Sequence, residues 1–90
     1  MGYTREFKKV LLSEPHATLG KNGITDEFIS HISKLLKRYK IIKIKALKSI
    51  AIKSNVKEIA HKISKNTESY LLDVRGFTFI ISKYPIEKNQ

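Results

Sequence analysis

The strongest constraint on the fold of this chain is a change of hydrophobic period between residues 25 and 48. Apolar residues recur at helical spacing over residues 25–39 and then alternate with polar residues over 41–48. The helical stripe consists of Phe28, Ile32, Leu35, Leu36 and Tyr39, with Ile29 at its border. The first pattern predicts a helix with one buried face, and the second predicts a strand covered on one side only. A helix that leads directly into such a strand is typical of an α/β domain.

Local signals support both elements. Thr25 is a good N-cap, and the acidic Asp26 and Glu27 suit the positive end of the helix dipole. Basic residues crowd the last turn, the end that favours cations: Lys34, Lys37, Arg38 and Lys40. On the strand, one face is expected to carry Ile42, Ile44 and Ala46, and the other Lys43, Lys45 and Leu47.

The same two periods predict the other elements. A short helix over residues 5–12 ends before Pro15 and is followed by a strand over 16–19. A second long helix is expected from Ser54 or Asn55 to Asn66, with a buried stripe of Val56, Ile59, Ala60 and Ile63. Residues 69–75 and 77–83 predict two strands joined at Gly76 by a turn, a bulge or a longer loop. Pro85 ends the sheet, and residues 85–90 form a tail.

The predicted order is therefore α-β-α-β-α-β-β. It indicates one compact two-layer α/β domain over residues 1–90, with its core in residues 5–84. The sheet should be four-stranded and mixed, because β-α-β crossovers join parallel strands and the last strand returns antiparallel. One face of the sheet is expected to stay open.

The net charge of +10 is concentrated in one part of the chain. Residues 34–65 hold eleven basic residues and one acidic residue, Glu58, whereas the segments on either side are each neutral. A charge needed only for solubility would be scattered. The block therefore favours a polyanionic partner, with a solvated lysine-rich surface as the alternative.

Catalysis, cofactors and metals find little support in the sequence. There is no cysteine, and the three histidines (His16, His31 and His61) lie on separate predicted elements without metal-ligand spacing. We expect His31 and His61 to be solvated and His16 to have a structural role, with a ligand contact beside the glycine loop as the alternative for His16. No Walker loop, dinucleotide fingerprint or nucleophile elbow is present. No signal peptide or membrane span is expected either, which favours a cytoplasmic location. The chain is also predicted to be a monomer and, for lack of catalytic motifs, not an enzyme.

Residues 19–27 contain a G-x-x-G loop, Gly20-Lys21-Asn22-Gly23, between the predicted strand and the capped helix. Two glycines allow a tight turn with bare N–H groups, and the following helix directs its positive end to the same place. Lys21 could bind phosphate, and Asn22 could contact a ribose or a base edge. A tight turn without a ligand is the alternative.

Residues 75–80, Arg-Gly-Phe-Thr-Phe-Ile, resemble the aromatic signature of an RNA recognition motif in part. Thr78 and Ser82 depart from that signature, and only seven residues follow Lys83, where that fold needs another helix and strand. Phe77, Phe79 and Ile81 are instead expected to pack under the helices.

Leu19 to Thr25, followed by a helix and then Ile41 to Lys45, resembles the CRM (chloroplast RNA splicing and ribosome maturation) domain. Its stand-alone bacterial and archaeal form is the YhbY family. The likeness continues through residues 56–60, Thr67 and residues 72–80, and the composition favours an archaeal member. The resemblance implies a fold similar to the C-terminal domain of translation initiation factor 3. It also implies binding of RNA through the glycine loop and association with large-subunit precursors of the ribosome.

The sequence thus predicts a non-catalytic protein that binds ribosomal RNA or a pre-ribosomal particle. The expected RNA-binding residues are Gly20, Lys21, Asn22, Gly23, Lys43, Lys45, Lys48 and Arg75. Two alternatives are a nucleic-acid binder driven by charge alone and a protein-interaction module with an acidic partner.

Overall fold

A four-stranded sheet in the order β1-β2-β4-β3 forms the centre of the fold. The computed structural model describes residues 8–20, 23–48 and 56–84. After a short helix over residues 8–12, here called the N-terminal helix, the elements are β1 (Ala17–Leu19), α2 (Asp26–Tyr39), β2 (Ile41–Ala46), α3 (Val56–Asn66), β3 (Tyr70–Arg75) and β4 (Thr78–Ser82). β1 is parallel to β2, and β4 is antiparallel to β2 and to β3. The predicted class, element order and mixed sheet are confirmed.

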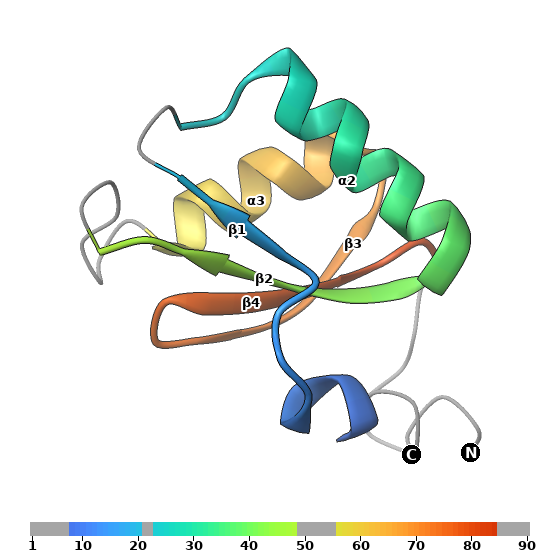
Figure 1. Cartoon of the computed structure of the whole chain (residues 1–90), viewed down its shortest axis with the longest axis vertical. Coiled ribbons are helices and arrows are strands. Elements are labelled where there is room, and N and C mark those ends of the chain that lie inside the picture. The colour runs from blue at the N-terminus through green and yellow to red at the C-terminus, as the bar shows by residue number, and fades with distance from the viewer. Residues whose placement is uncertain (1–7, 21–22, 49–55, 85–90) are drawn as a thin grey trace.

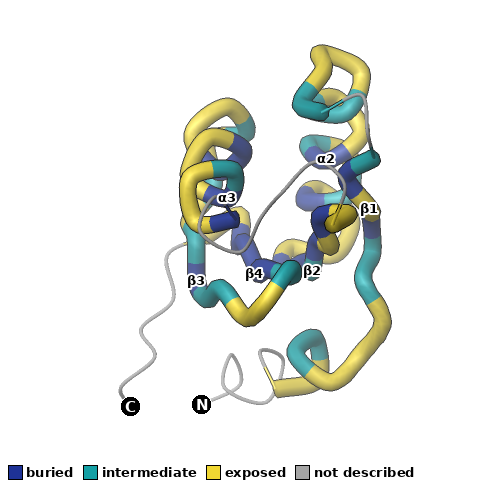
Figure 2. The backbone as a smooth tube through the Cα atoms, turned by 90° about the vertical axis from the view of Figure 1, so that its left-hand side faces the viewer, coloured by how far each residue is buried: buried dark blue, intermediate teal, exposed yellow. Residues whose placement is uncertain are grey.

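Both long helices cover the same face of the sheet (Figures 1 and 2). The alternation on β2 was interpreted correctly, because Ile42, Ile44 and Ala46 are fully buried under the helices. Phe79 and Ile81 of β4 join the same core, as predicted. The helices contribute the apolar stripes expected from their period, with Ile32, Leu36, Ala60 and Ile63 buried.

The two ends of α2 are fixed by local contacts. The Oγ1 atom of Thr25 accepts a hydrogen bond of 3.0 Å from the N–H of Phe28, which confirms the predicted N-cap. Lys40 ends the helix with a φ of 71°. The prediction that Tyr39 belongs to the buried stripe is wrong, because Tyr39 is 44% exposed. Its ring packs against His16 instead, with the centroids 5.0 Å apart.

The second face of the sheet is not wholly open. At one end the N-terminal helix packs Val10 and Leu11 against a small apolar cluster of Ile41, Leu72 and Ile80 (Figure 1). The sequence prediction of one open face is therefore wrong at this end. The cause is that Ile41 and Ile80 point to the side opposite their buried neighbours on the same strands.

The final hairpin turns tightly. Arg75 pairs with Thr78, so Gly76 and Phe77 form a two-residue connection, and Gly76 has the positive φ (58°) that such a turn requires. A bulge lies between Leu71 and Asp73 in β3 rather than at the turn. β2 and β3 run in the same direction, as predicted, but β4 lies between them. The expected start of α3 at Ser54 or Asn55 falls outside the described residues.

Candidate nucleic-acid interface

Three connections meet at one end of the sheet, on the left of Figure 1. Because β1 and β2 are parallel, their carboxyl ends lie at the same edge, and the N–H of Leu47 extends this pairing with a 3.1 Å hydrogen bond to the carbonyl of Leu19. The N–H of Ala46 donates to the carbonyl of Phe77 over 2.7 Å, which places the turn between β3 and β4 at the same end of the sheet. Gly20, Lys48 and Gly76 therefore come together at what we call the loop end.

The two glycines of the G-x-x-G loop have different roles. The N–H of Gly23 donates to the carbonyl of Gly20 over 3.0 Å and closes the turn. The sequence analysis expected this N–H to be free for a ligand, and that expectation is wrong. Gly23 has a φ of 75°, which favours glycine. Gly20 has no positive φ, and a Cβ atom there would meet nothing within 4 Å. Lys21 and Asn22 lie outside the described residues.

The N-terminus of α2 is a poorer phosphate site than the sequence suggested. One of its N–H groups is already bonded to Thr25, and the exposed carboxylates of Asp26 and Glu27 occupy the first turn. Their charge opposes that of a phosphate and offsets the helix dipole. An approaching anion would therefore depend on the lysines and arginine of the loop end.

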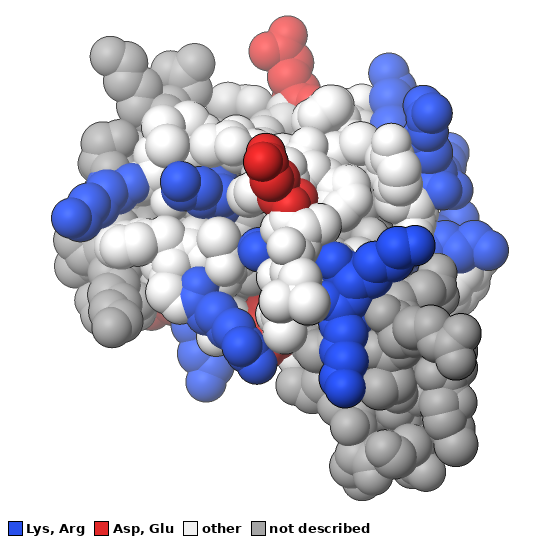
Figure 3. All heavy atoms as spheres, turned by 60° about the horizontal axis from the view of Figure 1, so that its bottom comes forward, with Lys and Arg blue, Asp and Glu red and all other residues white. Residues whose placement is uncertain are grey.

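A row of polar residues crosses all four strands beside the loop end. The register pairs Thr18 with Lys45, Lys45 with Thr78, and Thr78 with Arg75. Neighbouring strands lie about 4.8 Å apart, so the row spans roughly 14 Å. The row lies on the face opposite α2 and α3. Figure 3 brings this side forward and shows Lys and Arg side chains projecting from much of it, with fewer acidic groups.

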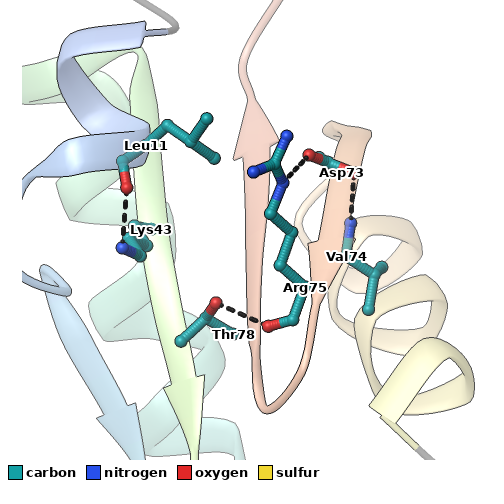
Figure 4. A network of polar contacts seen from close by, with 6 residues as sticks. All are labelled: Leu11, Lys43, Asp73, Val74, Arg75 and Thr78. Atoms are coloured by element: carbon teal, nitrogen blue, oxygen red, sulfur yellow. Dashed lines mark hydrogen bonds and ion pairs between the residues drawn. The ribbon is translucent and has the colours of Figure 1, made fainter.

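Arg75 is held in place by its own strand. Its Nε atom donates to Oδ2 of Asp73 over 2.9 Å, and Oδ1 of Asp73 accepts from the N–H of Val74 (Figure 4). The Arg75 side chain stays 65% exposed. Among the described residues, its terminal guanidinium nitrogens have no partner, so they can donate to a phosphate.

Lys43 has a structural role that the sequence analysis did not foresee. Its Nζ atom donates to the carbonyl of Leu11 over 2.9 Å (Figure 4). It also donates to the carbonyl of Ser13 over 3.1 Å, and thereby caps the N-terminal helix. This ammonium group is therefore less available to a ligand than that of Lys45, which is exposed on the same strand.

His16 extends the sheet beside Lys43. Its backbone N–H donates to the carbonyl of Lys43 over 2.8 Å, and its Nδ1 atom accepts from the N–H of Lys43 over 3.1 Å. Burial lowers the pKa of His16 from its usual value. The neutral ring can accept at Nδ1, which confirms the structural role predicted for His16.

Two residues near the glycine turn were missed by the sequence analysis. Lys62 and Asn66 of α3 line a pocket of about 470 Å³ together with Gly23 and Ile24. Their proximity to the glycine turn depends on how α3 packs beside α2. Only their i, i+4 spacing on one helix face was visible in the sequence.

Within the described residues, no group of three or more His, Asp or Glu side chains could hold a metal ion. His31 and His61 are exposed, as predicted. In the same part of the chain, no helix has the length and apolar character needed to cross a membrane.

Comparisons with known proteins agree with the resemblance drawn from the sequence. A model of the CRS1/YhbY (CRM) domain matches residues 5–83. The chain belongs to this family. The solution structure of the hypothetical Staphylococcus aureus protein SAV1595, described as a candidate RNA-binding protein, matches with a TM-score of 0.73 and 25% identity. That match covers 100% of this chain and 93% of the S. aureus chain. A comparison with curated proteins found no match. CRM domains are RNA-binding domains, and the fold of this chain is the CRM fold.

Proposed function

We propose that this CRM domain binds structured RNA, without catalysis, and that the loop end holds the sugar-phosphate backbone. The supporting observation is the convergence of the glycine turn, Lys48 and the polar row through Lys45 and Arg75 on one end of the sheet. Family membership and the description of the S. aureus neighbour support RNA as the ligand. We infer ribosomal RNA or a precursor of the large subunit as the target, bound by a cytoplasmic monomer.

Each group at the loop end has a chemical role in this proposal. The missing side chain of Gly20 lets the RNA backbone approach closely, while Lys21 and Asn22 reach a phosphate and a ribose. Lys45, Lys48 and Arg75 neutralise further phosphates, and Lys43 contributes less because its ammonium is engaged. With about four to six phosphate contacts, log affinity should fall with log salt at a slope of roughly −4 to −5.

The test measures binding of a labelled RNA hairpin by fluorescence anisotropy. Lys21→Asp combined with Asn22→Asp should abolish binding without changing the melting temperature. Ser30→Asp combined with Lys34→Asp changes the charge equally on exposed positions of α2 and serves as the matched control. Equal losses in both double variants would support the alternative of binding by charge alone. Unchanged affinity in the loop variant would remove the loop from the site.

The ribosomal target is tested in cells. Crosslinking followed by sequencing of the bound RNA should enrich ribosomal RNA, and the enrichment should disappear in the loop variant. Reads spread evenly over messenger RNAs would contradict the ribosomal assignment. Copurification with one acidic protein and no RNA would favour the protein-interaction alternative.

A further inference from the structure

The exposed aromatic side chains of the described residues all lie at the end of the sheet opposite the loop end. They are Tyr39, Tyr70 and Tyr84, which are 44%, 48% and 52% exposed. Tyr39 ends α2, Tyr70 begins β3 beside the last residue of β4, and Tyr84 follows β4. We call this region the tyrosine end. Exposed aromatic rings beside cations are the usual platform for unpaired bases.

Tyr84 is the best placed of the three to receive a base. Its backbone is anchored, because the buried Ser82 hydroxyl donates to the carbonyl of Tyr84 (2.7 Å) and accepts from its N–H (3.2 Å). Lys83 is fixed by a 2.7 Å hydrogen bond from its N–H to the carbonyl of Lys40, and its Nζ atom lies 5.8 Å from the centroid of the Tyr84 ring. The ring is thus partly preorganised before any ligand binds.

Tyr84 borders one of two pockets that lie between α2 and α3. This pocket, of about 470 Å³, is also lined by Lys37, Asn66 and Lys83. Asn66 also borders the pocket beside Gly23 and Lys62, so the two pockets adjoin. The two helices lie side by side above the sheet in Figure 2. Together the two pockets, called the groove below, extend from Gly23 past Asn66 to Tyr84.

The charges along this groove suit a nucleic-acid strand. Lys62, Lys37 and Lys83 line it, and Glu68 is the only carboxylate among the lining residues that the structure describes. Three cations along the path can neutralise successive phosphates. Glu68 lies in the pocket of Tyr84, where it would repel a phosphate but could accept from the exocyclic amine of a base. In this pocket Tyr84 and Glu68 therefore suit a base, while Lys37 and Lys83 can contact the phosphates that flank it.

We propose that the groove between α2 and α3 binds a single-stranded extension of the RNA and that an unpaired base stacks on Tyr84. This inference rests on the proposed RNA binding at the loop end and adds a second contact region to it. The preferred ligand is then a helical RNA with a single-stranded flank, because the loop end and the groove are occupied together.

The experiment compares a blunt RNA hairpin with the same hairpin carrying a 5′ or a 3′ tail of about six unpaired nucleotides. The quantity measured is the ratio of the two dissociation constants. One tailed form should bind the native protein more tightly, and Tyr84→Ala should reduce this gain by about 5- to 150-fold, up to its complete loss. Tyr84→Phe should keep the gain because it keeps the stacking surface.

Tyr70→Ala is the matched control, because Tyr70 is similarly exposed but pairs with Ser82 on the sheet rather than lining the groove. It should retain the full gain. The inference is overturned if neither tail increases affinity, or if Tyr70→Ala and Tyr84→Ala reduce the gain equally. The loop double variant reports separately on the proposed function, because its effect is measured on the blunt hairpin, which does not reach the groove.

Discussion

Lys43→Met should destabilise the fold but preserve most of the RNA affinity. Lys45→Met should leave the stability unchanged but weaken RNA binding. The two lysines are alternate residues of β2 and face the same side of the sheet. They differ in their contacts, because the Lys43 ammonium donates to two carbonyls whereas Lys45 is exposed. Methionine removes the charge and keeps an unbranched side chain, so each substitution tests the ammonium group alone.

The size of the Lys43 effect follows from its two hydrogen bonds. A bond from a charged donor contributes about 1.5–3 kcal/mol when well buried. The contact with Leu11 is only partly buried and that with Ser13 is exposed, so both together should contribute about 1.5 kcal/mol. For a domain of this size, 1 kcal/mol shifts the melting temperature by about 4–8 °C. We therefore expect Lys43→Met to lower it by roughly 6–12 °C.

Thermal unfolding followed by circular dichroism measures the first effect, and anisotropy at several salt concentrations measures the second. Lys45→Met should keep the native melting temperature and reduce the salt slope by about one unit, because one phosphate contact is lost. The reasoning is refuted if Lys43→Met keeps the native melting temperature and loses as much affinity as Lys45→Met. The ammonium of Lys43 would then serve the RNA and not the N-terminal helix.

Three further outcomes are expected from local geometry. Gly20→Ala should leave the melting temperature unchanged or slightly raised, because Gly20 has no positive φ and a Cβ there has room, but it should weaken RNA binding in the anisotropy assay. Gly23→Ala should lower the free energy of unfolding in urea by about 1–2 kcal/mol, because Gly23 has a positive φ. Burial lowers the pKa of His16 in the folded chain, so below about pH 6.5 the unfolded chain takes up this proton more readily than the folded chain does. The free energy of unfolding should therefore decrease as the pH is lowered from about 6.5, until the pH falls below the pKa of His16 in the folded chain. His16→Asn, whose Oδ1 can accept from Lys43, should lose this part of the pH dependence in thermal unfolding between about pH 5 and 8. Thr25→Ala should cost about 1 kcal/mol in the same urea assay through loss of the N-cap, with native RNA affinity at a temperature where the variant is folded.

The sequence was most informative where local period and burial agree. The alternation on β2 identified Ile42, Ile44 and Ala46 as buried, and the capping signal at Thr25 placed the start of α2. Both features depend on residues close together in the chain. Periodicity and capping could therefore predict the two layers and the element order.

Contacts between distant segments were not visible in the sequence. The stripe on α2 predicted a buried Tyr39, but the helix extends past the core at its last turn and the ring meets His16 instead. Lys43 was interpreted as a surface cation because nothing in its own strand shows that the carbonyls of Leu11 and Ser13 lie beside it. Both cases depend on where the N-terminal segment packs, which no local pattern specifies.

The basic block of residues 34–65 illustrates why charge alone could not locate the site. In sequence it is one continuous excess, but the fold divides it. Lys45 and Lys48 lie at the loop end, whereas Lys37, Arg38 and Lys40 lie at the tyrosine end. A divided charge attracts RNA without fixing its orientation. Orientation requires features that differ between the two ends, and the glycine turn and the anchored ring of Tyr84 are such features. An RNA with its helical part at the glycine turn and its unpaired flank on Tyr84 would have one orientation on the protein.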